Sequence, residues 1–285
     1  MTLYQTESTP SRFGPMTTGD PCLDLIAWGV PFRLSASSHT LLDQMREHAP
    51  FGSVECIAPV PDAAATFALH PVGSETRYQV FADDRLLSDA KSLDFSIQQL
   101  SSHLAIHVAE FAPDYVFLHA GVVAWQDRAL LLPGFSHAGK STLVAELVRA
   151  GASYYSDEFA LLDSEGRVHP FTRTLQMRRP GHPEQTPLPL AQLNGQAGTG
   201  PIPVDLVLFT EFAEGACWAP EFLSPGRAVL EMLLHAVPVQ RTPARVLATL
   251  TATMRHATAW RSKRGEAPET ARTLLTALAA REPLA

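Results

Sequence analysis

The chain has 285 residues, of which 46% are hydrophobic and 18% are charged, which is enough apolar material for one large globular domain or two small ones. The formal net charge is -7 and no run of Lys or Arg stands out, so the composition argues against nucleic acid or an anionic membrane surface as a partner. The three cysteines are far apart and follow neither a zinc spacing nor a disulfide framework, which fits a reducing cytosol.

The first twenty residues are polar and rich in Ser, Thr, Pro and Gly, which predicts a flexible N-terminus over residues 1–20. This segment has no basic start followed by an apolar core, and no stretch elsewhere reaches the length of a membrane-spanning helix. We therefore expect a cytoplasmic protein that makes no membrane contact.

Residues 21–91 contain short apolar runs separated by Pro, Gly and Asp, the pattern of short strands joined by turns. This predicts a small, mostly β subdomain. In residues 92–112 apolar side chains recur every three to four positions, which predicts an amphipathic helix that packs against the following sheet. We place the start of a second domain there, covering residues 92–285.

Two apolar runs, Tyr115–Trp125 and Ala129–Pro133, predict a hairpin that delivers the chain into Gly134. A helical pattern follows over Ser141–Ala150 and stops at Gly151, before two more predicted strands. Strand, loop, helix and strand in this order indicate an α/β fold.

The C-terminal half continues this pattern. Residues 180–203 are dense in Pro, Gly and Gln and predict a mobile surface loop, and Val204–Phe209 predicts a buried strand. Two helices are expected after Ser224-Pro225 and Thr242-Pro243, where a capping residue precedes Pro, and a last helix is expected over Pro268–Arg281.

The segment Gly134–Ser141 (GFSHAGKS) has the spacing of a phosphate-binding loop between a strand and a helix. Its glycines let successive amide N–H groups point at an anion, and the helix N-terminus adds its positive dipole end. Lys140 would reach the β- and γ-phosphates, and Ser141 would bind Mg²⁺. The alternatives are a glycine turn with a lone surface lysine, or a loop retained after activity was lost. The predicted nucleotide-binding residues are Gly134, Ser136, His137, Ala138, Gly139, Lys140, Ser141 and Thr142.

Asp157 and Glu158 follow an apolar strand one helix after the loop, where metal-binding and base carboxylates are found beside such loops. Asp157 could take a hydroxyl proton and Glu158 could help hold Mg²⁺. A solvated acidic turn is the alternative. Arg173 and Arg178 come shortly afterwards, and their planar guanidinium groups suit a clamp on phosphate or on a substrate carboxylate. His119, taken alone, fits a packed histidine better than a catalytic one.

Together these residues resemble the catalytic domain of the HPr serine kinase/phosphorylase family, and more closely its relatives beside peptide-modifying genes, such as kinases of lasso-peptide precursors. The resemblance covers roughly residues 92–235. The family's histidine falls on His119 and its paired acids on Asp157 and Glu158. The resemblance implies a P-loop nucleotide-binding domain of the HPr kinase type, with ATP and Mg²⁺ as cofactors. It also implies that His119 lies near the transferring phosphate and that Asp157 is the base that deprotonates a serine.

The chain departs from the family at several positions. His137 occupies a position that is Gly in HPr kinase, the second acid is Glu158 instead of Asp, and Ala120 follows His119. The first 90 residues are unlike that enzyme's regulatory domain, and the downstream glycine-rich signature associated with its phosphorylase activity is not found. These differences favour a kinase for an acceptor other than HPr.

We therefore expect a kinase that transfers the γ-phosphoryl group of ATP to a hydroxyl, most simply a serine of a small protein or peptide. The alternative hypotheses are transfer to a small-molecule hydroxyl, a non-catalytic nucleotide-sensing module and an NTP hydrolase. Members of the family often form rings or dimers, so the resemblance implies a homo-oligomer as one possible assembly.

Overall fold

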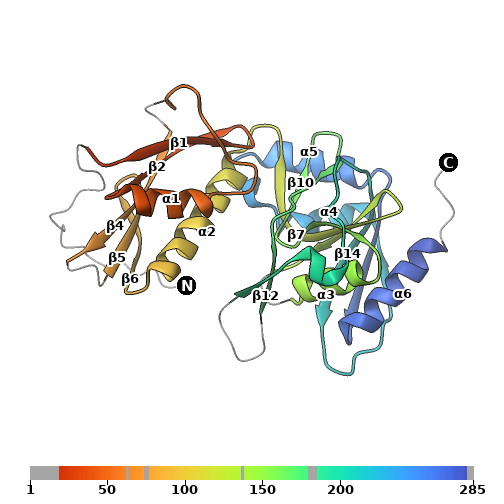
Figure 1. The fold of residues 1–285 in the computed structure, drawn as a ribbon. Coiled ribbons are helices and arrows are strands. Elements are labelled where there is room, and N and C mark those ends of the chain that lie inside the picture. Colours follow the sequence, from red (N-terminus) through yellow and green to blue (C-terminus); the bar gives the residue numbers. More distant parts are fainter. Residues whose placement is uncertain (1–18, 62–63, 74–76, 136–137, 179–184, 281–285) are drawn as a thin grey trace, which may run out of the picture. The chain divides into compact units, whose positions relative to one another are not determined.

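The protein is described by a computed structural model for residues 19–61, 64–73, 77–135, 138–178 and 185–280 (Figure 1). The chain divides into two compact units, Met1–Val108 and Ala109–Ala285. Most of the helix that begins at Leu93 falls in the first unit, whereas the sequence analysis placed it at the start of the second. The whole chain is α/β, as expected from the alternation of strand and helix patterns.

The first unit is built on a six-stranded sheet with the order β3-β1-β2-β4-β5-β6. Its strands pair antiparallel except for β2 and β4, which are parallel. Apolar side chains such as Phe32, Leu34 and Leu69 are buried on it. The elements are β1 Cys22–Ala27, β2 Val30–Ala36, α1 His39–Glu47, β3 Val54–Glu55, β4 Ala65–Val72, β5 Arg77–Ala82, β6 Arg85–Ala90 and α2 Leu93–Phe111.

The second unit is built on a mixed sheet with the order β11-β10-β7-β8-β14-β16-β15, in which β9 also pairs with β7. Strands β8, β14 and β16 are parallel, and the others pair antiparallel. The elements are β7 Val116–Trp125, β8 Arg128–Pro133, α3 Lys140–Arg149, β9 Ser153–Ser156, β10 Phe159–Leu162, β11 Val168–His169, β12 Leu175–Arg178, β13 Gln185–Leu188, η1 Leu190–Leu193, β14 Val204–Phe212, β15 Glu221–Leu223, α4 Pro225–Leu233, η2 Val237–Val239, α5 Pro243–Thr253, β16 Thr258–Arg264 and α6 Ala267–Ala279.

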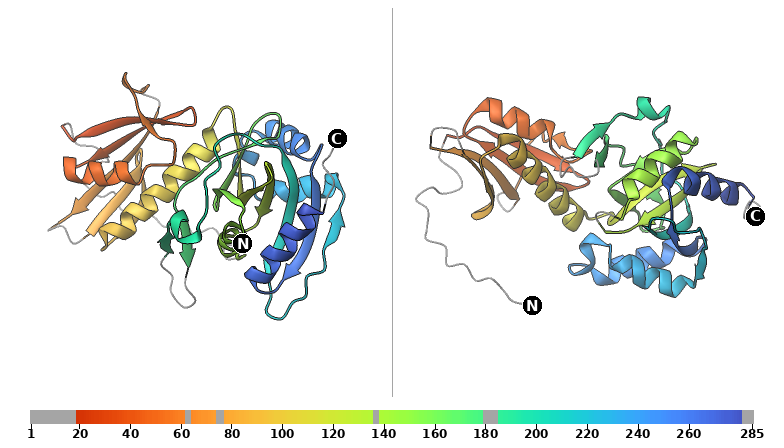
Figure 2. Two further views of the ribbon diagram at one scale, coloured as in Figure 1. Left: turned by 45° about the vertical axis from the view of Figure 1, so that its right-hand side comes forward. Right: turned by 90° about the horizontal axis from the view of Figure 1, so that it is seen from below.

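Helices cover both faces of this sheet (Figure 2). Helices α3 and α6 pack with Leu130 and Leu208 on one face, and α4 and α5 pack with Leu131 and Val207 on the other. Since neighbouring residues of a strand point to opposite faces, each central strand supplies both cores. The C-terminal helices begin near the predicted residues, and Ser224 accepts a hydrogen bond from the Arg227 amide at the start of α4.

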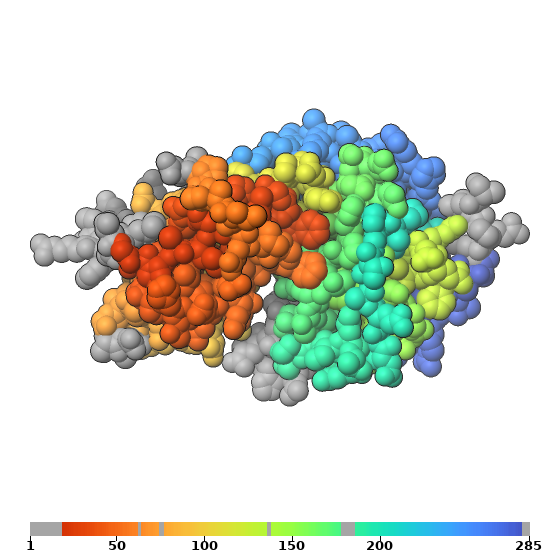
Figure 3. All heavy atoms as spheres, turned by 45° about the horizontal axis from the view of Figure 1, so that its top comes forward, coloured from red at the N-terminus to blue at the C-terminus, as the bar shows by residue number. Residues whose placement is uncertain are grey.

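The predicted hairpin is confirmed, because β7 and β8 pair antiparallel up to Trp125 and Arg128. For the described part of residues 180–203, the predicted surface position is confirmed, because most side chains there are exposed or half-buried, but the segment is not all loop. There β13 pairs with β12 in a two-stranded sheet, and bridges join Tyr154 to Ala197 and Val168 to Ile202. The green segment that contains β12 and the turquoise segment that follows it lie side by side in Figure 3. These pairings satisfy backbone groups that composition alone assigns to solvent.

No helix in the described part of the chain is both long enough and apolar enough to cross a membrane.

Candidate active site

The predicted phosphate-binding segment lies between β8 and α3, as the sequence analysis expected. Gly134 follows the last residue of β8, and its N–H donates to the His119 carbonyl at 3.3 Å. Helix α3 begins at Lys140, and Gly139 before it has φ +79°, a left-handed conformation that favours glycine. Thr142 lies in the first turn of this helix. Ser136 and His137 lie outside the described residues.

Lys140 turns back onto the segment that precedes it. Its Nζ donates to the carbonyl oxygens of Gly134 at 2.7 Å and Phe135 at 2.8 Å. Burial lowers the pKa of this ammonium group, while the charges of Asp157 and Glu158 oppose that effect. Among the described residues, no carboxylate lies within ion-pairing distance of Lys140, so its charge is met only by neutral oxygens.

The acid pair lies in a break between two short strands. Strands β9 and β10 both pair with β7, and Asp157 and Glu158 form the connection between them. The Ser156 hydroxyl accepts hydrogen bonds from the backbone N–H groups of Glu158 and Phe159, at 3.1 and 3.0 Å. This local turn interrupts the strand within the sheet and sets the two carboxylates side by side.

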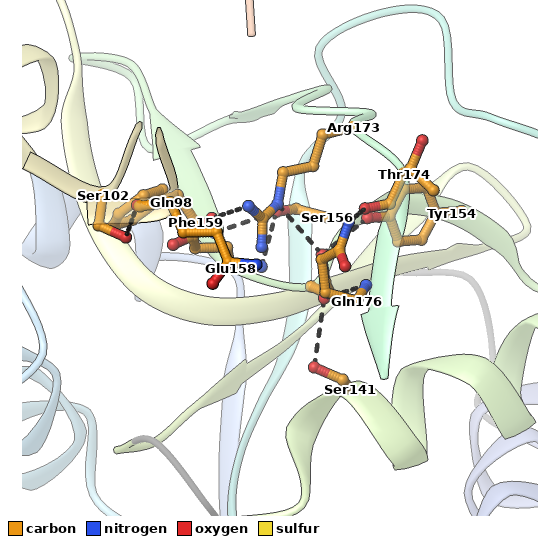
Figure 4. A network of polar contacts seen from close by, with 11 residues as sticks. Gln98, Ser102, Ser141, Tyr154, Ser156, Glu158, Phe159, Arg173, Thr174 and Gln176 are labelled. Carbon is orange, nitrogen blue, oxygen red and sulfur yellow. Dashed lines mark hydrogen bonds and ion pairs between the residues drawn. The ribbon is translucent and has the colours of Figure 1, made fainter. Parts of the chain in front are cut away.

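Asp157 is buried and its carboxylate accepts hydrogen bonds from three different elements. Figure 4 labels the three donor residues, Ser141, Tyr154 and Gln176. The Ser141 hydroxyl donates to Oδ2 at 3.2 Å, and the Gln176 backbone N–H donates to the same oxygen at 3.2 Å. The Tyr154 hydroxyl donates to Oδ1 at 2.9 Å. Burial raises the pKa of Tyr154, and the neighbouring Asp157 charge raises it further, so this phenol stays protonated as a donor.

Arg173 connects the two acids. Its Nη1 lies 2.5 Å from Glu158 Oε2, and its Nε lies 3.5 Å from Asp157 Oδ1. Burial raises the pKa of Glu158, and the Arg173 charge opposes the rise. Glu158 keeps more than a quarter of its side-chain surface exposed, whereas Asp157 has almost none. The two carboxylates therefore differ in access to solvent although they are neighbours in sequence.

Two histidines lie close to the phosphate-binding segment. The His119 ring stacks on Phe159 with ring centroids 4.6 Å apart, and its backbone N–H donates to the His235 carbonyl at 2.8 Å. The His235 ring lies 4.5 Å from that of Phe135. Burial lowers the pKa of both imidazoles, and the Lys140 charge lowers it further. Both effects favour the neutral form of the two rings.

The structure thus brings four of the predicted site residues, Ser141, Asp157, Glu158 and Arg173, into one connected network. Arg178 is the last residue of β12, and its side chain lies outside the described part of the structure.

Sequence reasoning missed Tyr154, Gln176 and Arg264. Tyr154 and Gln176 donate to Asp157, and a pattern of residue types gives no signal for either contact. Arg264 Nη2 donates to the Gly139 carbonyl at 2.9 Å, and no local pattern of residue types signals this contact. These contacts join segments that are distant in sequence.

The residues present fit a magnesium ion held jointly with a phosphate ligand. No cluster of three or more His, Cys, Asp or Glu side chains in the described ranges could hold a metal by itself. Mg²⁺ commonly takes only one or two protein carboxylates together with substrate phosphates and waters. The Ser141 hydroxyl and the Asp157 carboxylate supply oxygen donors of that kind 3.2 Å apart.

No protein-family model matches the chain, and no curated protein matches it. Solved structures do match it, among them the HPr(Ser) kinase/phosphatase from Coxiella burnetii. That match has a TM-score of 0.33 and 13% sequence identity, and it covers 57% of this chain and 95% of that chain. The likeness is weak.

Proposed function

We propose that this protein is an ATP-dependent kinase that transfers the γ-phosphoryl group to a hydroxyl, most simply a serine of a small protein or peptide. One observation carries the proposal, the 3.2 Å contact between the Ser141 hydroxyl and Asp157 Oδ2. Phosphate-binding loops use their Ser or Thr together with a strand carboxylate to hold the metal that bridges the phosphates. A glycine turn with a surface lysine would not require a buried acid at that place.

The residues have separate tasks in this proposal. Lys140 leaves the Gly134 and Phe135 carbonyls to bind the β- and γ-phosphates, with the amide groups at the start of α3. Mg²⁺, when bound, neutralises charge on the phosphates during transfer, and Ser141 and Glu158 would hold it. Arg173 binds phosphate oxygens once it leaves Glu158. His119 is a half-buried residue beside Phe159 whose lowered pKa favours the neutral imidazole, and in this proposal it lies near the transferring group.

Asp157 and Glu158 share the tasks of proton acceptor and metal ligand. Following the resemblance, we propose Asp157 as the base and Glu158 as the metal ligand. In the reverse division, Asp157 is the metal ligand, because it contacts Ser141 directly, and Glu158 is the base, because it is the more exposed acid. The two divisions make different predictions. A Glu158→Gln protein that needs far more Mg²⁺ but keeps its maximal rate would support our division, and an Asp157→Asn protein with that behaviour would reverse it.

The test is intact-mass analysis of acceptor candidates, including peptides encoded beside this gene, incubated with the protein, Mg²⁺ and ATP. A phosphate-sized mass gain that falls by about 10²-fold or more in Lys140→Ala and Asp157→Asn would support the kinase. Lys91→Ala is the matched control, because Lys91 is an exposed lysine in the first unit.

Other outcomes would replace the proposal with one of its alternatives. Phosphorylation of small-molecule hydroxyls alone would exclude a protein acceptor. ATP binding without any mass gain across a broad panel would indicate a nucleotide-sensing module. Rapid ATP hydrolysis without an acceptor would indicate an NTP hydrolase.

A further inference from the structure

Arg264 is one of the largest fully buried side chains of the protein, with 2% of its surface exposed. It is the last residue of β16, which runs parallel to β14 and places Arg264 opposite Phe212. Strand β14 in turn runs parallel to β8, which leads into the phosphate-binding segment. Because the carboxyl ends of parallel strands meet at one edge of a sheet, β16 delivers this arginine to the loop.

The contacts of the Arg264 guanidinium are all with neutral groups. Nη2 donates to the Gly139 carbonyl at 2.9 Å, and Nη1 donates to the Gly265 carbonyl at 3.0 Å. The guanidinium carbon lies 5.5 Å from the centre of the Phe212 ring. Nε is buried and has no hydrogen-bond partner among the described residues. Hydrogen bonds to a carboxylate or a phosphate would be stronger than these bonds to neutral carbonyls.

The charge of Arg264 is not balanced within the described part of the chain, where no carboxylate lies within 4 Å of it. Burial lowers the pKa of its guanidinium, and the opposing influence comes from Glu266, whose side chain is exposed. Helix α3 begins directly after Gly139, so its positive end lies at the residue that Arg264 contacts. Buried charge is costly unless it is paired.

The bond to Gly139 also sets the direction of a neighbouring amide. In a trans peptide the C=O and N–H groups point in opposite directions, so holding the Gly139 carbonyl also holds the Lys140 N–H. The same carbonyl accepts the first helical hydrogen bond, from the Leu143 N–H at 3.1 Å. A Cβ atom on residue 139 would lie 2.4 Å from Arg264 Nη2, so only glycine admits the arginine this close.

We propose that Arg264 is a positioning residue of the phosphate-binding loop whose counter-charge is the polyphosphate group of the bound ligand. The inference rests on the proposed function only in that the loop binds phosphates. It predicts that Arg264 is an electrostatic burden on the protein without ligand and a source of affinity with it. A purely structural arginine would stabilise the protein in both states.

The test compares thermal unfolding and binding, with and without ATP and inorganic tripolyphosphate, for wild type and for Arg264→Met and Arg264→Lys. Arg264→Met should unfold no earlier than wild type without ligand, and should bind both ligands at least about tenfold more weakly. Arg264→Lys keeps the charge and should bind with intermediate affinity. Arg261→Met is the matched control, because Arg261 lies on the same strand and forms an ion pair with Glu231.

Wild-type affinity for both ligands in Arg264→Met would overturn this inference and leave the kinase standing. A large loss of stability without ligand in both Arg264→Met and Arg264→Lys would also overturn it, because that is the behaviour of a structural arginine. Tripolyphosphate binding that depends on Arg264, with no transfer to any acceptor, would support the inference and count against the kinase. A wild-type protein that binds neither ligand would contradict both.

Discussion

The two sides of the candidate site satisfy their charges in different ways. On the acid side, Asp157 accepts hydrogen bonds from Ser141, Tyr154 and Gln176, and Arg173 lies close to it. On the loop side, Lys140 and Arg264 donate only to backbone carbonyl oxygens. The protein itself thus supplies the acid side with an ion pair and several hydrogen-bond donors, whereas the loop side has positive charge without an anionic partner among the described residues.

This difference separates a preorganised region from one that responds to ligand. Donors fixed around Asp157 hold the carboxylate in place before any substrate arrives, and such preorganisation lowers the reorganisation needed during reaction. Under the proposed function, the lysine and the buried arginine would gain their strongest interactions only with a bound phosphate. Substitutions on the two sides should therefore differ in whether they lower stability without ligand or only the response to ligand.

The largest expected effect on stability comes from Asp157→Asn. An amide presents one oxygen and one NH₂ group, so the oxygen would turn to the fixed Gln176 N–H and leave the NH₂ group facing Arg173. Losing a buried charged acceptor should lower the free energy of unfolding by about 2–3 kcal/mol. Chemical denaturation without nucleotide measures this loss.

Asp205→Asn is the control for that prediction. Asp205 is also mostly buried and ion-paired, with Arg128 at 3.4 Å, but it lies near the start of β14, at the end of the strand away from the phosphate-binding segment. The substitution Asp205→Asn should lower the free energy of unfolding without impairing phosphate transfer. Equal stability of Asp157→Asn and wild type would show that the acid side is not held together by this carboxylate.

A smaller effect is expected for Gly139→Ala, which acts on the loop side. The left-handed backbone at φ +79° and the close approach of Arg264 Nη2 both oppose a Cβ atom there. The strain should cost about 1–3 kcal/mol, and displacement of Arg264 should also weaken ATP binding. Calorimetric titration with ATP, together with thermal unfolding, measures both consequences.

Gly226→Ala is matched to this substitution, because Gly226 lies in the first turn of α4 and a Cβ there meets nothing within 4 Å. Its replacement should be neutral or slightly stabilising. If Gly139→Ala behaved in the same way, the close contact between the loop and Arg264 would not matter for stability or binding.

The smallest effect is expected from acidification. Burial and the Lys140 charge lower the pKa of His119 below its ordinary value of 6.5. The unfolded chain therefore binds a proton more readily, and the free energy of unfolding should fall as the pH drops below 6.5 toward the depressed folded pKa. Each unit of pKa difference contributes about 1.4 kcal/mol. His119→Gln should flatten the dependence between pH 6.5 and 5, as followed by denaturation at each pH, and an unchanged slope would contradict it.

The amino-acid sequence by itself determined the local features of this protein. The hairpin into Gly134, the helix after Gly139 and the helix start at Ser224 depend on residues a few positions apart, so spacing and composition predict them. The same holds for the Asp157-Glu158 pair as a candidate, because its distance from the loop is readable in the chain.

Tertiary structure alone decided what these features contact. Strand pairing brings Arg264 to Gly139 across 125 residues, and the β12 strand brings the Gln176 N–H to Asp157. It also converts the described part of residues 180–203 from an expected loop into a strand, a short helix and bridges to the sheet. Such contacts depend on sheet order and burial, which no local pattern encodes. The residue type alone does not show whether an arginine is buried or exposed.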